Sequence, residues 1–392
     1  PNNPEASSTD DKNNNIYFNS YNFDWKGSKE FQNPIVNSQG EDRNHQYFFI
    51  GGSRFREIDN QDNHYTFTFG EGRRVNLGGI LTLGIVSQEN GAIIKNQGTI
   101  TDEEEKDEKW IKDMHNYYDA GKDFMTIKGP SEAIYEVKRS KDGYVGYKVG
   151  IAQVQENGGR DRDTNKDETT WYMDGHNQTL INAQGGEIDF RGERSIGMYA
   201  YLPDFTSWAI MKNSGTISLS GSESYGMKLA ARTASRAEMT NEGTINLRKN
   251  PDGKDQANNS AGMALMEDIS VRKNVNLDSG KAKNTGTINL TDVQNSSGTY
   301  INVDSDITNK GTININSVIA KDDKNQALNV GMRADKGTNK GGTNKATVIN
   351  ESSGKINLKG SYAIGMLANG AKLINKGKIA TVDNITNGVG LA

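Results

Sequence analysis

The sequence predicts an all-β protein, a parallel β-helix in which short coils stack into a rod. Three observations predict this fold class: two short phrases that alternate along the chain, a minimum spacing of 25 residues between copies, and an apolar content of only 33% in 392 residues. A thin rod has a narrow core and much surface, so it needs fewer apolar residues than a globular protein of this length.

The first phrase reads apolar-x-Asn-x-Gly-[Thr/Lys]-Ile-x-apolar. In Ile217-Ser218-Leu219, apolar and polar residues alternate with the period of a half-buried strand, and the preceding Asn and Gly supply turn conformations. The sequence therefore predicts a strand after each turn. Two copies have two extra residues between Asn and Ile, and the eight copies begin at Asn96, Asn182, Asn213, Asn241, Asn284, Asn309, Asn350 and Asn375.

The second phrase, [Ser/Thr/Asn/Ala]-x-Gly-apolar, follows every copy of the first. It occurs at 82–85, 195–198, 224–227, 260–263, 329–332 and 363–366, with degraded copies at 296–299 and 387–390. Asn284 and Asn309 are 25 residues apart, as are Asn350 and Asn375, whereas Asn96 and Asn182 are 86 apart. A fixed minimum with variable excess indicates coils of two or three strands, with insertions at their corners.

Stacked coils pair each strand with its equivalent above and below, at about 4.8 Å per coil. Eight coils then make a rod of about 40 Å. The methionines of the second phrase form an inner column, which we interpret as core packing and not as a metal channel, because Ile85 and Thr299 take the same position. A second inner column consists of Ile100, Ile188, Ile217, Ile245, Ile288, Ile313, Ile356 and Ile379.

The chain divides into three parts. Residues 1–15 are polar and expected to be disordered or extended, and 76–392 hold the coils, with 76–80 as a weak first copy. Residues 16–75 are rich in Tyr, Phe and Trp. A solenoid needs a cap over the open end of its core, so we interpret 16–75 as an N-terminal β cap; the alternative is an aromatic binding platform.

The 86-residue gap holds the largest excess. Val145-Gly146-Tyr147 resembles the second phrase and divides the excess into lateral insertions at 102–143 and 152–179. The first insertion begins with a capping box, Thr101 to Glu104, and the aromatic residues that follow lie on one helical face. We therefore predict a short helix near 102–120.

Few residues of the sequence are candidates for catalysis or metal binding. The four histidines, His45, His64, His115 and His176, have no metal-ligand spacing, and the chain has no cysteine. Asp278-Ser279-Gly280 lacks the partners of a serine nucleophile. The net charge of −4 gives no electrostatic case for nucleic acid. We predict no catalytic, cofactor or metal site, and no enzyme.

Binding residues are expected in the insertions, because loops on a rigid scaffold are the usual carriers of recognition. The insertions hold aromatic types that supply binding hot spots and stack on sugars. The alternative is that these aromatic residues only pack the insertions onto the rod. The candidate binding residues are Trp110, Tyr117, Tyr118, Trp171 and Tyr172.

The two alternating phrases resemble the repeats of type V autotransporter passenger domains, most of all the RadD-like group of large fusobacterial adhesins. The resemblance covers about 76–392. It implies a right-handed parallel β-helix at the bacterial outer membrane surface, exported through a C-terminal barrel that this fragment lacks. It also implies that the chain is a monomer.

The resemblance further implies that the chain is an adhesin, with a role in virulence and coaggregation. The expected partners are host-cell surface proteins or glycans, or the surfaces of other bacteria. Two other functions stay open: a polysaccharide-acting β-helix enzyme, a lyase or glycosidase, with carboxylates on one face, and a stalk with no binding surface.

Overall fold

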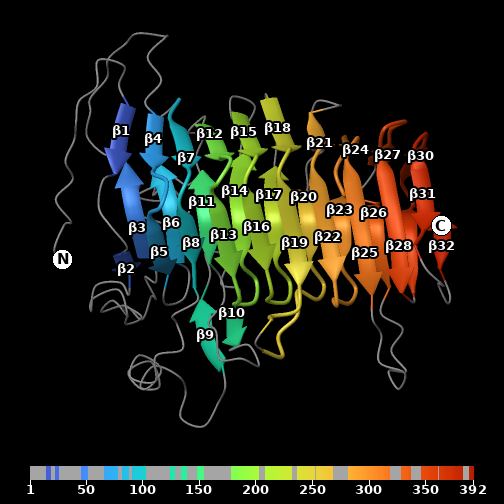
Figure 1. Ribbon diagram of the computed structural model, residues 1–392, viewed down its shortest axis with the longest axis horizontal. Helices are drawn as coiled ribbons and strands as arrows, with labels where there is room; N and C mark the ends of the chain where they lie inside the picture. Colours follow the sequence, from blue (N-terminus) through green and yellow to red (C-terminus); the bar gives the residue numbers. More distant parts are fainter. Residues whose placement is uncertain are drawn as a thin grey trace, which may run out of the picture.

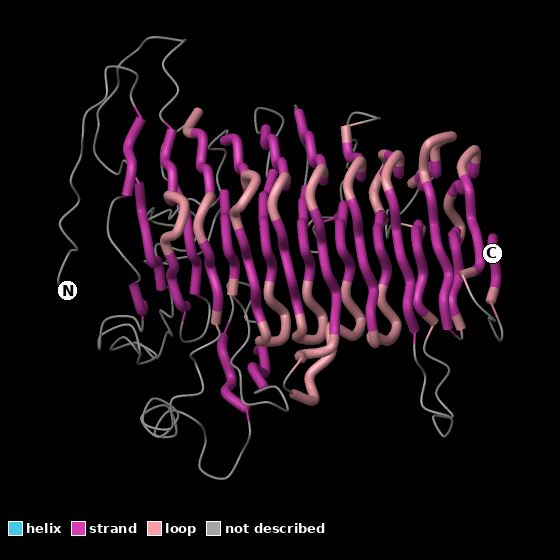
Figure 2. Tube along the Cα trace, viewed as in Figure 1, coloured by secondary structure: helices cyan, strands magenta, loops and turns pink. Residues whose placement is uncertain are grey.

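The protein is an elongated stack of β-strands, as the computed structural model shows (Figure 1). No helix occurs in the part of the chain that is described, and the strands lie side by side along the long axis (Figure 2). The structure describes residues 15–18, 23–25, 46–51, 66–77, 82–87, 91–102, 124–128, 134–138, 148–153, 178–202, 208–231, 236–251, 253–267, 281–317, 328–336, 346–360, 362–382 and 388–392.

Three ten-stranded parallel sheets form the stack. Sheet 1 contains β1 (Asn15–Phe18), β4 (Thr66–Phe69), β7 (Ile93–Asn96), β12 (Gln178–Asn182), β15 (Trp208–Asn213), β18 (Arg236–Asn241), β21 (Ala282–Asn284), β24 (Asp306–Asn309), β27 (Thr347–Asn350) and β30 (Lys372–Asn375). These strands end at the asparagine of the first phrase from coil 3 onward.

Sheet 2 holds the strands that follow the Asn-Gly turn. It contains β2 (Phe23–Trp25), β5 (Arg74–Leu77), β8 (Thr99–Thr101), β13 (Glu187–Phe190), β16 (Thr216–Leu219), β19 (Thr244–Arg248), β22 (Thr287–Thr291), β25 (Thr312–Ser317), β28 (Lys355–Gly360) and β31 (Lys378–Thr381).

Sheet 3 holds the strands of the second phrase. It contains β3 (Gln46–Gly51), β6 (Thr82–Ser87), β11 (Val149–Gln153), β14 (Ile196–Leu202), β17 (Tyr225–Ala231), β20 (Ala261–Glu267), β23 (Ser297–Ile301), β26 (Asn329–Asp335), β29 (Ala363–Asn369) and β32 (Val389–Leu391). One strand from each sheet makes a coil, so coil 1 is β1, β2 and β3 and coil 10 is β30, β31 and β32. The predicted right-handed parallel β-helix is confirmed as the fold class.

The core consists of the columns of inward-facing apolar residues that the repeat predicts. The predicted isoleucines pair in register along sheet 2 and are at most 1% exposed, except Ile379 in the last coil, which is partly buried. The methionine column lies in the same core, with Met198, Met227 and Met263 fully buried in consecutive coils. Its role is packing, because Ile151 fills the same position in coil 3.

Asparagine side chains form a ladder inside the turn between sheets 1 and 2. Each Nδ2 donates to the Oδ1 of the asparagine in the next coil, at 2.7–2.9 Å, from Asn96 through to Asn375. The side chains from Asn96 to Asn350 are fully buried. Buried amides are costly without partners, so the ladder explains why Asn recurs there.

A serine ladder forms the corner before sheet 3. The backbone N–H of Ser195 donates to Oγ of Ser224 at 3.0 Å, and Ser224 donates likewise to Ser260 at 2.9 Å. Ser260 donates to Ser296 at 3.1 Å, and Ser296 donates to Oδ1 of Asn329 at 3.0 Å. The first residue of the second phrase is thus a hydrogen-bonding position.

The register corrects two predictions. In coil 2, Val75 pairs with Ile100 and Phe69 pairs with Asn96, so the coil uses 66–77 and the weak copy placed at 76–80 is wrong. In coil 3, Val149 pairs with Ile196, so the second phrase is 148–151 and not Val145-Gly146-Tyr147. These two copies were misplaced because Phe69 takes the position of the usual Asn in coil 2 and Lys148 takes that of the usual Ser in coil 3.

Strands within 16–75 are also members of the stack. β2 pairs with β5 and β3 pairs with β6, both in parallel, so these segments extend the three sheets by two coils. The count is ten coils where eight were predicted. Whether this region acts as a cap stays a prediction. The helix predicted near 102–120 lies outside the described residues beyond Asp102, as does the leader before Asn15.

Candidate functional site

The largest insertion leaves coil 3 at Asp102 and rejoins it at Lys148. Thr101 pairs with Asp189 in coil 4, which puts Asp102 beside Phe190. The N–H of Ile196 donates to the carbonyl oxygen of Lys148 at 2.7 Å, which puts Lys148 beside Ser195. The two stems of the insertion therefore begin and end in regular positions of the β-helix.

These two positions carry charges where the other coils do not. The position of Asp102 belongs to a column of buried apolar residues that includes Leu77, Phe190 and Leu219. The position of Lys148 belongs to the serine ladder. Asp102 and Lys148 are both fully buried. An ion pair thus replaces a core residue and a ladder serine at the base of the insertion.

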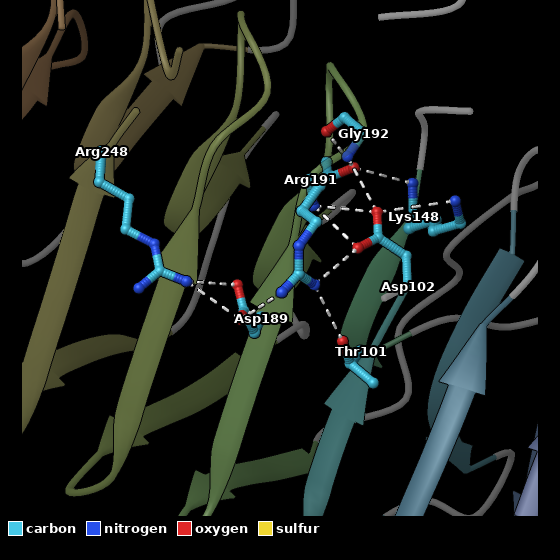
Figure 3. A network of polar contacts seen from close by, with 8 residues as sticks. Thr101, Asp102, Lys148, Asp189, Arg191, Gly192 and Arg248 are labelled. Carbon is cyan, nitrogen blue, oxygen red and sulfur yellow. Dashed lines mark hydrogen bonds and ion pairs between the residues drawn. The ribbon is translucent and has the colours of Figure 1, made fainter. Parts of the chain in front are cut away.

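The carboxylate of Asp102 is enclosed by donors (Figure 3). Lys148 Nζ lies 3.8 Å from Oδ2, and Arg191 Nη1 lies 3.8 Å from Oδ1. The backbone N–H of Arg191 donates to both oxygens at 2.9 Å, and the N–H of Gly192 donates to Oδ2 at 2.8 Å. The next coil therefore supplies backbone and side-chain partners to this one carboxylate.

Burial and the partners act on Asp102 in opposite directions. Loss of water raises the pKa of the Asp102 carboxyl above 3.8, while Lys148, the two backbone N–H groups and the Arg191 guanidinium lower it. Burial has the larger effect, and the pKa is raised overall. A buried ion pair of this kind positions groups more than it stabilises them.

The network continues along the outside of sheet 2 (Figure 3). Arg191 Nη2 lies 3.5 Å from Oδ2 of Asp189. Arg248, two coils further on, donates to both Asp189 oxygens at 3.0 and 3.1 Å. Coils 3, 4 and 6 are therefore connected at the base of the insertion.

The insertion also contains regular structure. β9 (Phe124–Lys128) and β10 (Ile134–Lys138) pair antiparallel, with Phe124 opposite Lys138. In Figure 1 this hairpin projects beyond one edge of the rod. The sequence predicted an insertion here, but a hairpin within it was not foreseen.

The described residues offer no open chemical centre. Within the described ranges no group of three or more His, Asp or Glu side chains could hold a metal ion. Asp102 has no exposed surface from which to act on a substrate. What the arrangement does is mechanical: it ties both stems of the insertion to one another and to coil 4.

The predicted binding residues Trp110, Tyr117, Tyr118, Trp171 and Tyr172 all lie outside the described residues, and their role stays a prediction. Sequence reasoning missed Asp102 and Lys148 as a pair. The signal was present, because the copy at Ile100-Thr101-Asp102 ends in Asp where Ile217-Ser218-Leu219 ends in Leu. A charged residue at a core position of a repeat calls for a partner.

No protein-family model, curated protein or solved structure matches this chain. In the described part, no helix has the length and apolar character needed to cross a membrane. The class of protein is thus defined by the fold alone: a parallel β-helix with a lateral insertion anchored by a buried ion pair.

Proposed function

We propose that this chain is a fragment of a bacterial cell-surface adhesin, a β-helical passenger whose lateral insertion binds molecules on host cells or on partner bacteria. The observation that carries this proposal is the anchoring of the insertion between Asp102 and Lys148. Burying two charges in a narrow core is costly. That cost is understandable where a long insertion must leave a rigid rod at a fixed place.

A rod with a firmly held projection suits adhesion. Each coil adds about 4.8 Å, so a rod carries the insertion away from its point of attachment. The scaffold fixes the loop stems, and the loop supplies variable contacts. Location at the outer membrane surface and the partner classes follow from the resemblance of the repeats, and they belong to the same proposal.

The strand register defines a deletion variant that tests the proposed role of the insertion in adhesion. Since Asp102 lies beside Phe190 and Lys148 beside Ser195, the four-residue corner Arg191-Gly192-Glu193-Arg194 is the natural replacement for 103–147. We expect the spliced chain to keep its β-rich circular dichroism spectrum and its thermal midpoint, and to lose binding to host cells and to partner bacteria.

The control variant removes a smaller insertion from another coil. The corner at 249–260 in coil 6 carries a small insertion closed by the antiparallel bridge between Lys249 and Gln256. Replacing 249–259 with the corner 221–223 of coil 5, which is the matching segment in the register, should leave adhesion intact. A folded chain without 103–147 that still adheres would refute the assignment, and a folded parent chain that binds neither cell type would refute adhesion by this fragment.

A further inference from the structure

The outer face of sheet 3 carries two tyrosine units in coils 5 to 8, whereas the stems of the insertion lie in coil 3. Lys228 Nζ lies 4.6 Å from the ring centre of Tyr225, and the Arg333 guanidinium lies 5.7 Å from the ring centre of Tyr300. Both distances are within the range of cation–π contacts. Lys228 Nζ also lies 5.9 Å from the ring centre of Tyr199, so the first cation contacts two rings and the second contacts one.

Each tyrosine also has a carboxylate near its hydroxyl. Burial raises the pKa of Tyr225, and the charge of Glu223 raises it further. Burial, followed by Asp335, raises the pKa of Tyr300 to about 12 against a smaller opposing effect of Arg333, and the Tyr300 hydroxyl hydrogen-bonds to the Asp335 carboxylate. The units Tyr225–Lys228–Glu223 and Tyr300–Arg333–Asp335 thus combine the same residue types, although Lys228 lies on the strand of Tyr225 whereas Arg333 lies on the next strand and pairs with Tyr300.

The strand between the two units carries a small residue on its outer face. β20 of coil 6 places Ala264 outward between the core residues Met263 and Leu265. Ala264 pairs with Lys228 on one side and Tyr300 on the other, and these larger side chains leave it fully buried.

The two tyrosines lie two coils apart, about 9.6 Å along the axis. They are also offset along the strand direction, because Tyr300 is in register with Lys228 and not with Tyr225. The units remain partly accessible: the side chains of Arg333 and Glu223 are 40% and 50% exposed, and both tyrosines are partly exposed. Arg333 Nη2 lies 2.8 Å from Asp335, which fixes its guanidinium plane. The result is a rigid strip of rings, donors and acceptors along coils 5 to 8.

We propose that this strip, formed by Glu223, Tyr225, Lys228, Tyr300, Arg333 and Asp335, binds an uncharged carbohydrate chain that runs along the rod axis. Sugars present apolar C–H faces, which pack on aromatic rings, and hydroxyls, which pair with carboxylates and guanidinium groups. The strip holds two cations and two carboxylates, and Arg194, which lies 2.7 Å from Glu223, adds one positive charge at its edge, so the strip lacks the large net charge that would favour a polyanion.

The inference deepens the proposed function, on which it rests for its biological setting, but its site is separate from the insertion. The purified chain is titrated with cellohexaose, mannohexaose and N-acetylchitohexaose, with heparin as the polyanion. We expect saturable binding of at least one neutral oligosaccharide. Replacing both Tyr225 and Tyr300 with Ala should weaken it about tenfold or more, since each ring is a central contact.

Trp208→Ala on the outer face of sheet 1 is the matched control, because it removes an aromatic residue from another face and should leave the affinity unchanged. If the double alanine variant fails to fold, Glu223→Gln with Asp335→Asn keeps both rings and should still lower the affinity severalfold. The chain spliced at 103–147 keeps the strip and should bind normally, which separates this test from the test of adhesion.

Four results would overturn the proposal. They are no saturable binding of any neutral oligosaccharide, equal affinity in the folded tyrosine or carboxylate variants, preference for heparin that salt abolishes, and self-association of the chain that the tyrosine changes abolish. The last result would assign the strip to a second copy of the chain.

Discussion

The side-chain amide of Asn213 donates to the amide oxygen of Asn241, 2.7 Å away in the next coil, and Asn241 makes the same bond to Asn284 at 2.7 Å. The residues are 28 and 43 positions apart in the chain. Coils of different length therefore meet in one continuous ladder. The ladder holds the coils in register and leaves excess residues to the corners.

Replacing Asn241 with Ala should destabilise the rod. The change leaves the Nδ2 group of Asn213 without its acceptor and the Oδ1 atom of Asn284 without its donor, both in a fully buried place. We expect a loss of about 2–4 kcal/mol in the free energy of unfolding. Urea denaturation followed by circular dichroism measures it.

Asn375→Ala is the matched control, since Asn375 is exposed in the last coil and only accepts from Asn350. Water can replace that contact, so the loss should stay below about 1 kcal/mol. Equal effects at Asn241 and Asn375 would contradict a ladder in which burial sets the cost.

The second phrase needs its glycine for space. At Gly226, an added Cβ would lie 2.5 Å from the carbonyl oxygen of Gly262 and 2.6 Å from Cγ2 of Ile245. The first neighbour is backbone and cannot rotate away. Gly226→Ala should therefore lower the free energy of unfolding by about 1–3 kcal/mol, as overpacking typically does, and the thermal midpoint should fall with it.

Gly390 in coil 10 has the same place in the phrase but no atom within 4 Å of a built Cβ. Gly390→Ala should change the free energy of unfolding by less than about 0.5 kcal/mol and leave the thermal midpoint nearly unchanged. A destabilising Gly390→Ala together with a harmless Gly226→Ala would show that backbone conformation, not close approach, selects glycine there.

The sequence predicted the coil and its inner columns because these depend on local repetition. Ile217 and Ile245 recur with the phrase, and the structure pairs them directly. The ladders were not predicted, because spacing shows that Asn recurs but not that its side chain turns inward. Coil 2 was misplaced since Val75 and Phe69 carry the register without Asn or Ile.

The candidate site was predictable only in outline. A long insertion after Thr101 followed from the 86-residue gap. Its anchor depends on a contact between Asp102 and Lys148, which the insertion separates in the chain, and no local pattern joins them. The tyrosine strip is equally non-local, because Tyr225 and Tyr300 lie in different copies of a phrase whose outer positions vary.

The buried ion pair predicts a particular pattern of energies. Asp102→Leu restores the apolar column but leaves Lys148 buried without its main partner, and should cost about 3–5 kcal/mol. Lys148→Ser alone leaves the carboxylate with Arg191 and two backbone donors, and should cost less. The double variant restores the pattern of the other coils and should equal or exceed the parent in stability, by up to about 4 kcal/mol.

Denaturant unfolding of the four proteins of this double-mutant cycle measures the coupling between the two residues. We expect the double variant to lose far less stability than the sum of the two single variants, which is a large coupling between the residues. If the double variant is less stable than either single variant, the pair contributes to folding beyond compensating its own burial.

The same carboxyl gives a dependence on pH. Because burial raises the pKa of Asp102 above 3.8, the folded chain holds a proton that the unfolded chain has already lost when the pH lies between 3.8 and the raised pKa. The unfolded state then binds fewer protons, so this group's contribution to the free energy of unfolding falls as the pH rises through that window. Below 3.8 the contribution is fully present.

The chain with Asp102→Leu and Lys148→Ser lacks this carboxyl, so its advantage over the parent should grow as the pH is raised from below 3.8 toward neutrality. Thermal midpoints of both proteins across that range, at constant ionic strength, measure the difference. Adhesion of the parent across the same range provides a second readout, because the stems of the insertion stay in place whenever the rod is folded. A difference in stability that shrinks with rising pH would mean that Lys148 and Arg191 outweigh burial, and that the pKa of Asp102 is lowered.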